Sequence, residues 1–172
     1  MRITGKPVPV RSCRECEIMK TISVSSDAFL EGERVPSRYT CSGKNVSPAL
    51  SWGEPPEGTK SLALICDDPD APSGLFTHWV LYDIPPDRRG LPEGVKKAPV
   101  LDDGSRHGVN NFGKIEYSGP CPPPGKPHRY FFRIFALDTL LNLRSPADRR
   151  TVDNTMKGHV LATGELMGTF AR

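Results

Sequence analysis

Runs of apolar and aromatic residues bounded by proline or glycine dominate the pattern along this chain, and they predict strands. Residues 61–66 (SLALIC) are continuously apolar, which is typical of a strand buried on both faces. Two further runs, 77–84 and 129–138, are rich in aromatic and β-branched residues. Alternation at 22–24 and an extended pattern over 161–170 add strands near the two ends.

The chief helix candidate is the segment near residues 146–158. Pro146 suits a first-turn position, Thr151 is a candidate cap for a later start, and Gly158 would end the helix. Strands at irregular spacing, joined by long Pro- and Gly-containing loops, indicate an all-β or β-dominated single domain. We expect two packed antiparallel sheets with Pro-rich loops and one or two short helices.

The charge of the chain divides it into two parts. The net charge is +3, and residues 1–20 hold five basic and two acidic groups, so the remainder is balanced. We interpret 1–20 as a basic N-terminal extension and 21–172 as the folded domain. A balanced domain without a basic stripe predicts no nucleic-acid partner. No apolar stretch is long enough to predict a membrane span.

The cysteines bear on compartment and metal binding. Five cysteines, an odd number, fit a reducing compartment, and residues 1–20 lack the apolar core of a signal peptide, so we predict a cytoplasmic protein. Cys13 and Cys16 form a CxxC pair, but no further zinc ligands stand near them. We therefore expect neither a metal nor a cofactor, and we interpret residues 1–18 as a plain extension before Met19.

Two Pro-rich loops carry the candidate chemistry. Residues 68–72 (DPDAP) lead to His78, and residues 119–125 (GPCPPPG) lead to His128 and Tyr130. Proline fixes φ and removes a donor, so such loops hold their shape. Side chains two apart on a strand share a face, so His128 and Tyr130 point the same way. If the loops meet, the rim carries a carboxylate, two imidazoles and a phenol, a set suited to a small polar or anionic ligand.

These two motifs resemble those of the phosphatidylethanolamine-binding protein family, in its bacterial and archaeal, Raf-kinase-inhibitor-like branch. The resemblance runs from about residue 21 to 172 and includes residues 45–48 (NVSP), 50–52 (LSW) and 158–161 (GHVL). It implies a pocket with a wall of backbone near Gly119 and Pro120, and with Asp70 in an Asx-type turn and Pro72 as structural neighbours. The ligand-binding side chains that it implies are Asp68, His78, His128 and Tyr130.

The resemblance also implies a function. Protonated imidazoles and a phenol can donate to phosphate oxygens, and a carboxylate can accept from an ammonium, so a phosphorylethanolamine-like head group suits the site. We expect a homodimer with a regulatory role, its protein partner being a kinase or a protease that it inhibits. The family fold brings Cys41 and Cys121 toward the pocket end, where we expect free thiols rather than a disulfide.

Two other classes of function stay open. The four pocket side chains are equipped for acid–base or metal-assisted catalysis. No GxSxG nucleophile motif is present, however, and Asp68 and His78 are ten residues apart, whereas a two-His-one-carboxylate iron site usually has them one residue apart. The third class is a structural or dimerisation protein with a vestigial pocket. We favour the binding protein over both.

Overall fold

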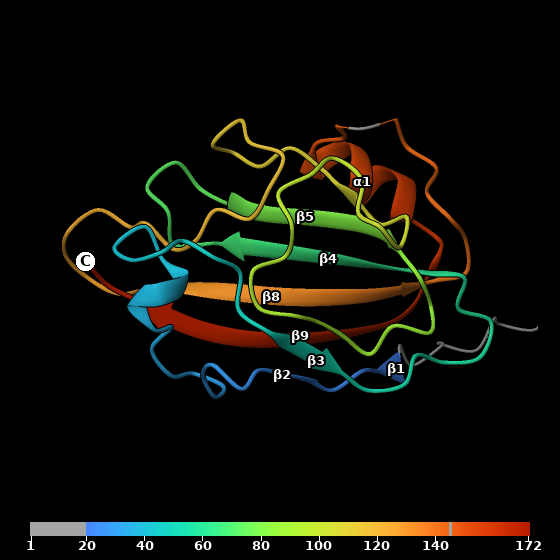
Figure 1. Ribbon diagram of the computed structural model, residues 1–172, viewed down its shortest axis with the longest axis horizontal. Coiled ribbons are helices and arrows are strands. Elements are labelled where there is room, and N and C mark those ends of the chain that lie inside the picture. The colour runs from blue at the N-terminus through green and yellow to red at the C-terminus, as the bar shows by residue number, and fades with distance from the viewer. Residues whose placement is uncertain (1–19, 145) are drawn as a thin grey trace, which may run out of the picture.

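Four long strands lie side by side and form the centre of the molecule (Figure 1). They are β4 (Ser61–Asp68), β5 (Phe76–Ile84), β8 (His128–Leu137) and β9 (Val160–Phe170). The structure, a computed structural model, describes residues 20–144 and 146–172. The predictions for residues 1–18, including the Cys13 and Cys16 pair, lie outside this range.

Short strands complete two sheets. The large sheet has the order β1-β9-β8-β4-β5-β7 and the small one β2-β3-β6. All pairs are antiparallel except β1 with β9. The prediction of a β-dominated fold of two sheets is confirmed. The remaining elements are β1 (Lys20–Thr21), β2 (Val24–Ser25), the 3₁₀ turn η1 (Ser37–Tyr39), β3 (Leu50–Trp52), β6 (Gly90–Leu91) and β7 (Arg106–His107).

Strand β4 is buried on both faces, as its continuous apolar run predicts. Leu62 and Leu64 point into the core between the two sheets. Ala63 and Ile65 point into a second apolar cluster on the opposite face, which the helix covers. Burial at every position explains why β4 lacks the alternation of a strand with one face in water.

Helix α1 (Arg149–Met156) begins between the two starts that the sequence offers, after Pro146 and before Thr151. Its N-cap is Asp148, whose Oδ1 accepts a hydrogen bond from the backbone N–H of Thr151 at 2.7 Å. Thr151 therefore lies inside the first turn and is not the cap. Val152 and Met156 pack into the second apolar cluster, one turn apart on the same side of the helix. No helix among the described residues is long and apolar enough to cross a lipid bilayer.

Strand pairing brings the two predicted motifs to one end of the large sheet. Because β4 runs antiparallel to both β5 and β8, its last residue, Asp68, lies beside the first residues of these neighbours. Along β8 the side chains alternate, so His128 and Tyr130 are buried in the same row as the core residue Phe132, while Arg129 points outward. The site thus continues the row of core residues.

Candidate functional site

A pocket of about 320 Å³ opens at this end of the sheet. Asp68, His78 and His128 provide its polar groups, from β4, β5 and β8 respectively. The predicted polar rim thus forms from three of its four side chains. The other lining residues are mostly apolar: Ala71, Pro72, Ser73, Phe76, Phe112, Cys121, Pro122 and Pro123.

A larger hollow of about 470 Å³ lies beside α1. Its arginine closest to the core, Arg149, is paired with the buried Asp67 at 3.0 Å and with Asp153 on the next turn. Arg149 thus faces two carboxylates, whereas among the described residues the two histidines of the smaller pocket make their ring hydrogen bonds through Nδ1 alone. We therefore place the candidate site in the smaller pocket.

Asp68 and His128 form a hydrogen-bonded pair at the floor of the pocket. The Nδ1–H of His128 donates to Oδ2 of Asp68 at 2.8 Å, and Oδ1 of Asp68 accepts from the backbone N–H of Asp70 at 2.8 Å. Both carboxylate oxygens are thus occupied, and the carboxylate is buried. An acceptor at Nδ1 sets the tautomer of the ring and leaves Nε2 for a ligand. Among the described residues this Nε2 has no hydrogen-bond partner.

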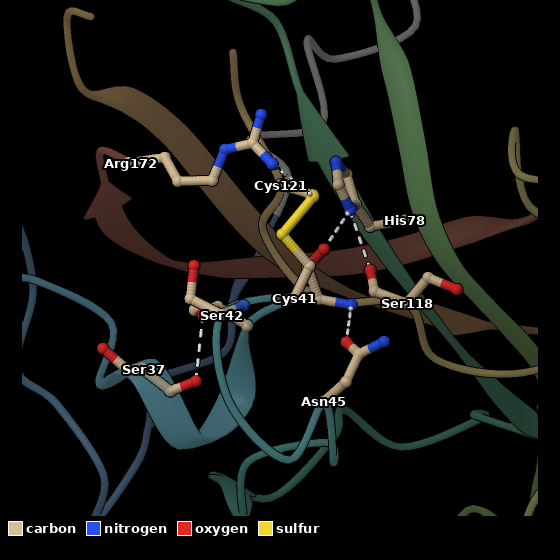
Figure 2. The surroundings of a disulfide bond; sticks show 10 residues. Ser37, Cys41, Ser42, Asn45, His78, Ser118, Cys121 and Arg172 are labelled. Carbon is tan, nitrogen blue, oxygen red and sulfur yellow. Dashed lines mark hydrogen bonds between the residues drawn. A yellow bond between two sulfur atoms is a disulfide. The ribbon is translucent and has the colours of Figure 1, made fainter. Parts of the chain in front are cut away.

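His78 is held by backbone carbonyls instead. Its Nδ1–H donates to the oxygen of Ser118 at 2.7 Å and, more weakly, to that of Gly119 at 3.1 Å (Figure 2). Burial lowers the pKa of this imidazole, and the two carbonyls and Asp68 oppose that effect only in part. At neutral pH the ring is therefore uncharged, and Nε2 is an acceptor that becomes a donor in acid.

Tyr130 lies beneath the pocket and does not line it. Its ring packs edge-on against His78, with centroids 5.2 Å apart, and the side chain is fully buried. Burial, and next the charge of Asp68, raise the pKa of the phenol well above its usual value. Within the described residues the hydroxyl has no hydrogen bond of ordinary geometry. Tyr130 therefore supports the position of His78 and offers no direct contact at the pocket surface.

Gly119 and Pro120 also stand one layer behind the pocket surface. Gly119 donates its N–H to Oδ1 of Asn45 at 2.7 Å, and the carbonyl of Pro120 accepts from the N–H of Cys41 at 3.1 Å. The backbone at Gly119 and Pro120 therefore supports the pocket from behind. The residues of this loop that line the pocket begin at Cys121.

Asp70 has a different role from the one predicted. The Asx-type contact in this loop is made by Asp68, which accepts from the N–H of Asp70. Asp70 instead accepts from the backbone N–H and the guanidinium of Arg129, at 2.7–2.9 Å. This contact lowers the pKa of the Asp70 carboxyl to about 2. Asp70 thus connects the DPDAP loop to the start of β8 through Arg129.

The expectation of free thiols at Cys41 and Cys121 is wrong, because the two residues form a disulfide. Their Cα atoms are 5.3 Å apart although 80 residues separate them in the sequence. The segment after η1 lies directly against the GPCPPPG loop, which brings the sulfurs together (Figure 2). The bond also removes Cys121 as a nucleophile in the oxidised protein. The other described cysteine, Cys66, is buried in the core.

The aromatic part of the pocket was not predicted from the sequence. Phe76 and Phe112 meet edge to face with ring centroids 4.8 Å apart. The ring centroid of His78 lies 5.3 Å from that of Phe76 and 5.4 Å from that of Phe112. Phe112 is 43% exposed in a polar loop, and an exposed aromatic residue in such a loop is the signal that was available. In the described part of the chain, no three His, Cys, Asp or Glu side chains are grouped to hold a metal ion.

Comparisons with known proteins agree with this architecture. The sequence profile of the family described as phosphatidylethanolamine-binding protein matches residues 25–171. A UPF0098 protein of Methanothermobacter thermautotrophicus is 53% identical over 88% of this chain and 99% of its own length. A UPF0098 protein of Aquifex aeolicus is 48% identical over 88% and 89%.

Two solved structures share the fold. The crystal structure of a phosphatidylethanolamine-binding protein homologue from Chlamydia trachomatis is 37% identical, with a TM-score of 0.80 over 89% of this chain and 99% of that one. E. coli YbcL, described as a new member of the mammalian family, is 33% identical, with a TM-score of 0.82 over 88% and 98%. On sequence and on fold, this chain belongs to the phosphatidylethanolamine-binding protein family.

Proposed function

We propose that this protein binds a small phosphorylated ligand of the phosphorylethanolamine type in the pocket of Asp68, His78 and His128. One observation carries the proposal: each histidine has its Nδ1 held by a fixed acceptor, and among the described residues no hydrogen bond is made by either Nε2. On the family relationship alone, we extend the proposal to a regulatory role in the cytoplasm, exerted by a homodimer on a kinase or protease.

The two sides of the pocket suit the two ends of such a ligand. A protonated Nε2 donates a charge-assisted hydrogen bond to a phosphate oxygen, and Asp68 holds the His128 ring in position through Nδ1. Phe76 and Phe112 present aromatic rings on which an ammonium group can rest through a cation–π contact. Apolar walls around few polar groups are typical of small-molecule sites.

Binding is expected to be strongest in acid. Burial lowers the pKa of His78, so this ring gains its proton, and becomes a donor, only below the usual histidine value of about 6.5. A bound anion favours the charged ring and moves the titration back upward. Affinity for phosphate should therefore increase as pH falls through this range and weaken as pH rises.

Calorimetric titration with O-phosphorylethanolamine and with inorganic phosphate, between about pH 5.5 and 8.5, tests the proposal. His128→Ala should abolish most of the binding. His159→Ala is the matched control, because His159 also donates Nδ1–H to a carboxylate, that of Asp138 at 2.7 Å, but lies outside the pocket. Affinity that is flat with pH, or full binding by His128→Ala, would overturn the proposal.

A further inference from the structure

The disulfide between Cys41 and Cys121 is part of the candidate pocket. Cys121 lines the pocket directly, beside Pro122 and Pro123. Cys41 belongs to the segment that follows η1, and its sulfur is bonded to that of Cys121 (Figure 2). The bond therefore connects the pocket surface to a segment 80 residues away in the sequence.

The backbone just before Cys121 carries the acceptors of His78. Residues 117–121, here called the strap, contact His78 on one side through the carbonyls of Ser118 and Gly119. On the other side the strap is bound to residues 39–45 by three hydrogen bonds. These are Tyr117 Oη to the Tyr39 carbonyl at 2.7 Å, the Gly119 N–H to Asn45 at 2.7 Å, and the Cys41 N–H to the Pro120 carbonyl at 3.1 Å.

The pocket wall, here residues 122–127, follows the strap directly, and the disulfide at Cys121 is its main attachment to the rest of the protein. Residues 123–127 are exposed, and prolines 122–124 have no N–H to donate. Among the described residues, no backbone–backbone hydrogen bond outside the strands involves 121–127. The wall is therefore attached at Cys121 at one end and at His128, the start of β8, at the other.

The bond is also placed for exchange with an external thiol. Cys41 is exposed, whereas Cys121 is half-buried and has the guanidinium of Arg172 4.0 Å from its sulfur. A positive charge stabilises a thiolate, so Cys121 is the better leaving group and Cys41 the accessible point of attack. Cys66 is fully buried in the core and is not positioned to attack the bond.

We propose that this disulfide is a redox switch that sets the affinity of the pocket. A dithiol reductant attacks the Cys41 sulfur, and the Cys121 thiolate leaves and takes up a proton. The second thiol of the reductant then resolves the mixed disulfide and releases the Cys41 thiol. Two electrons and two protons pass to the protein, and the reductant becomes a disulfide. The strap and wall loosen, His78 loses its fixed acceptors, and ligand affinity falls.

The switch rests on the proposed function, and thermodynamic linkage makes it reciprocal. If reduction lowers the affinity for the ligand by a certain factor, then bound ligand lowers the equilibrium constant for reduction of the disulfide by the same factor. We expect a change of about tenfold, within the usual range of coupling between sites. For a two-electron couple, tenfold corresponds to a shift of about 30 mV toward more negative reduction potential.

The test compares oxidised and dithiothreitol-reduced full-length protein carrying Cys13→Ser and Cys16→Ser, so that 41–121 is the one accessible pair. Calorimetry with O-phosphorylethanolamine measures affinity, and circular dichroism checks that the reduced chain stays folded. We expect about tenfold weaker binding after reduction. The control protein carries Cys41→Ser and Cys121→Ser in addition to the first two substitutions. It should bind weakly with or without reductant. Redox titration with and without the ligand measures the reciprocal shift, and hydrogen exchange should increase over the strap.

Each outcome is decisive. Oxidised protein that does not bind the probe overturns the proposed function, and the switch with it. Oxidised protein that binds, but with equal affinity after reduction and no shift of potential, overturns the switch alone. Global unfolding on reduction also overturns it, since the proposed loosening is local to the strap and wall.

Discussion

Replacing Gly119 by alanine tests whether the strap supports the pocket as described. An added Cβ would stand 2.0 Å from the carbonyl oxygen of Tyr39 and 2.9 Å from the Cα of Thr40. Both are backbone atoms, so the strap must move away from residues 39–45. That movement weakens the hydrogen bond to Asn45 and displaces a carbonyl that accepts from His78.

The size of the effect follows from the packing. Inserting a methylene into a close-packed site costs about 1–3 kcal/mol. A gain of about 0.4–1 kcal/mol, from the reduced freedom of the unfolded chain, offsets part of this cost. The net loss is therefore up to about 2.6 kcal/mol, which corresponds to a melting temperature lower by up to about 10 °C in a chain of this size. Ligand affinity should fall in parallel.

Gly53→Ala is the matched control. There the nearest atom to an added Cβ is the hydroxyl of Ser23 at 2.8 Å, which can rotate away. Thermal unfolding of both variants, followed by circular dichroism, gives the comparison. Equal melting temperatures for Gly119→Ala and Gly53→Ala would refute the reasoning about the strap, as would an unchanged affinity for the probe in Gly119→Ala.

Three further predictions concern a buried ion pair, the contact between Asp70 and Arg129, and the N-terminal residues. Asp67→Ala removes a fully buried carboxylate from its arginine partners and should cost about 3–5 kcal/mol of unfolding free energy, whereas Asp102→Ala, at an exposed pair, should cost less than about 1 kcal/mol in the same urea titrations. The pKa of Asp70 lies at about 2, below its ordinary value of 3.8, so its contact with Arg129 stabilises the fold above about pH 4 and is lost as pH falls toward 2; Asp70→Asn should remove part of that acid dependence of the melting temperature. Deletion of residues 1–18 should leave the melting temperature nearly unchanged, and a drop of many degrees would contradict our interpretation of them as a plain extension.

The long strands were predicted well from the sequence, because their burial gives them recognisable patterns of apolar residues. The apolar run 61–66 and the aromatic run 129–138 become β4 and β8 almost at the expected bounds. The small sheet was not resolved strand by strand. Its strands are two or three residues long, too short for a periodicity to appear, and they exist because other segments pair with them.

At the site, the sequence identified the polar groups of the pocket but not their depth below the pocket surface. Asp68, His78 and His128 line the pocket, as their neighbouring Pro-rich loops suggested. Tyr130 shares a face with His128 and yet lies deeper, because the ring of His78 packs against it. The alternation of side chains along a strand predicts which face a residue points to, but not how far it lies below the pocket surface. The disulfide and the Phe76–Phe112 contact depend on loops meeting in space, which no local pattern records.

The alternation along β8 has a consequence for how such a site can diversify. His128 is the terminal member of a row whose deeper members hold the two sheets together. Shifting the register of the whole strand by one residue would turn Arg129 inward and His128 outward, and would invert the faces of the core at the same time. Ligand preference in this architecture is therefore free to change by substitution at the end of the row or by remodelling the loops. A change in the spacing of the strand itself would cost the fold.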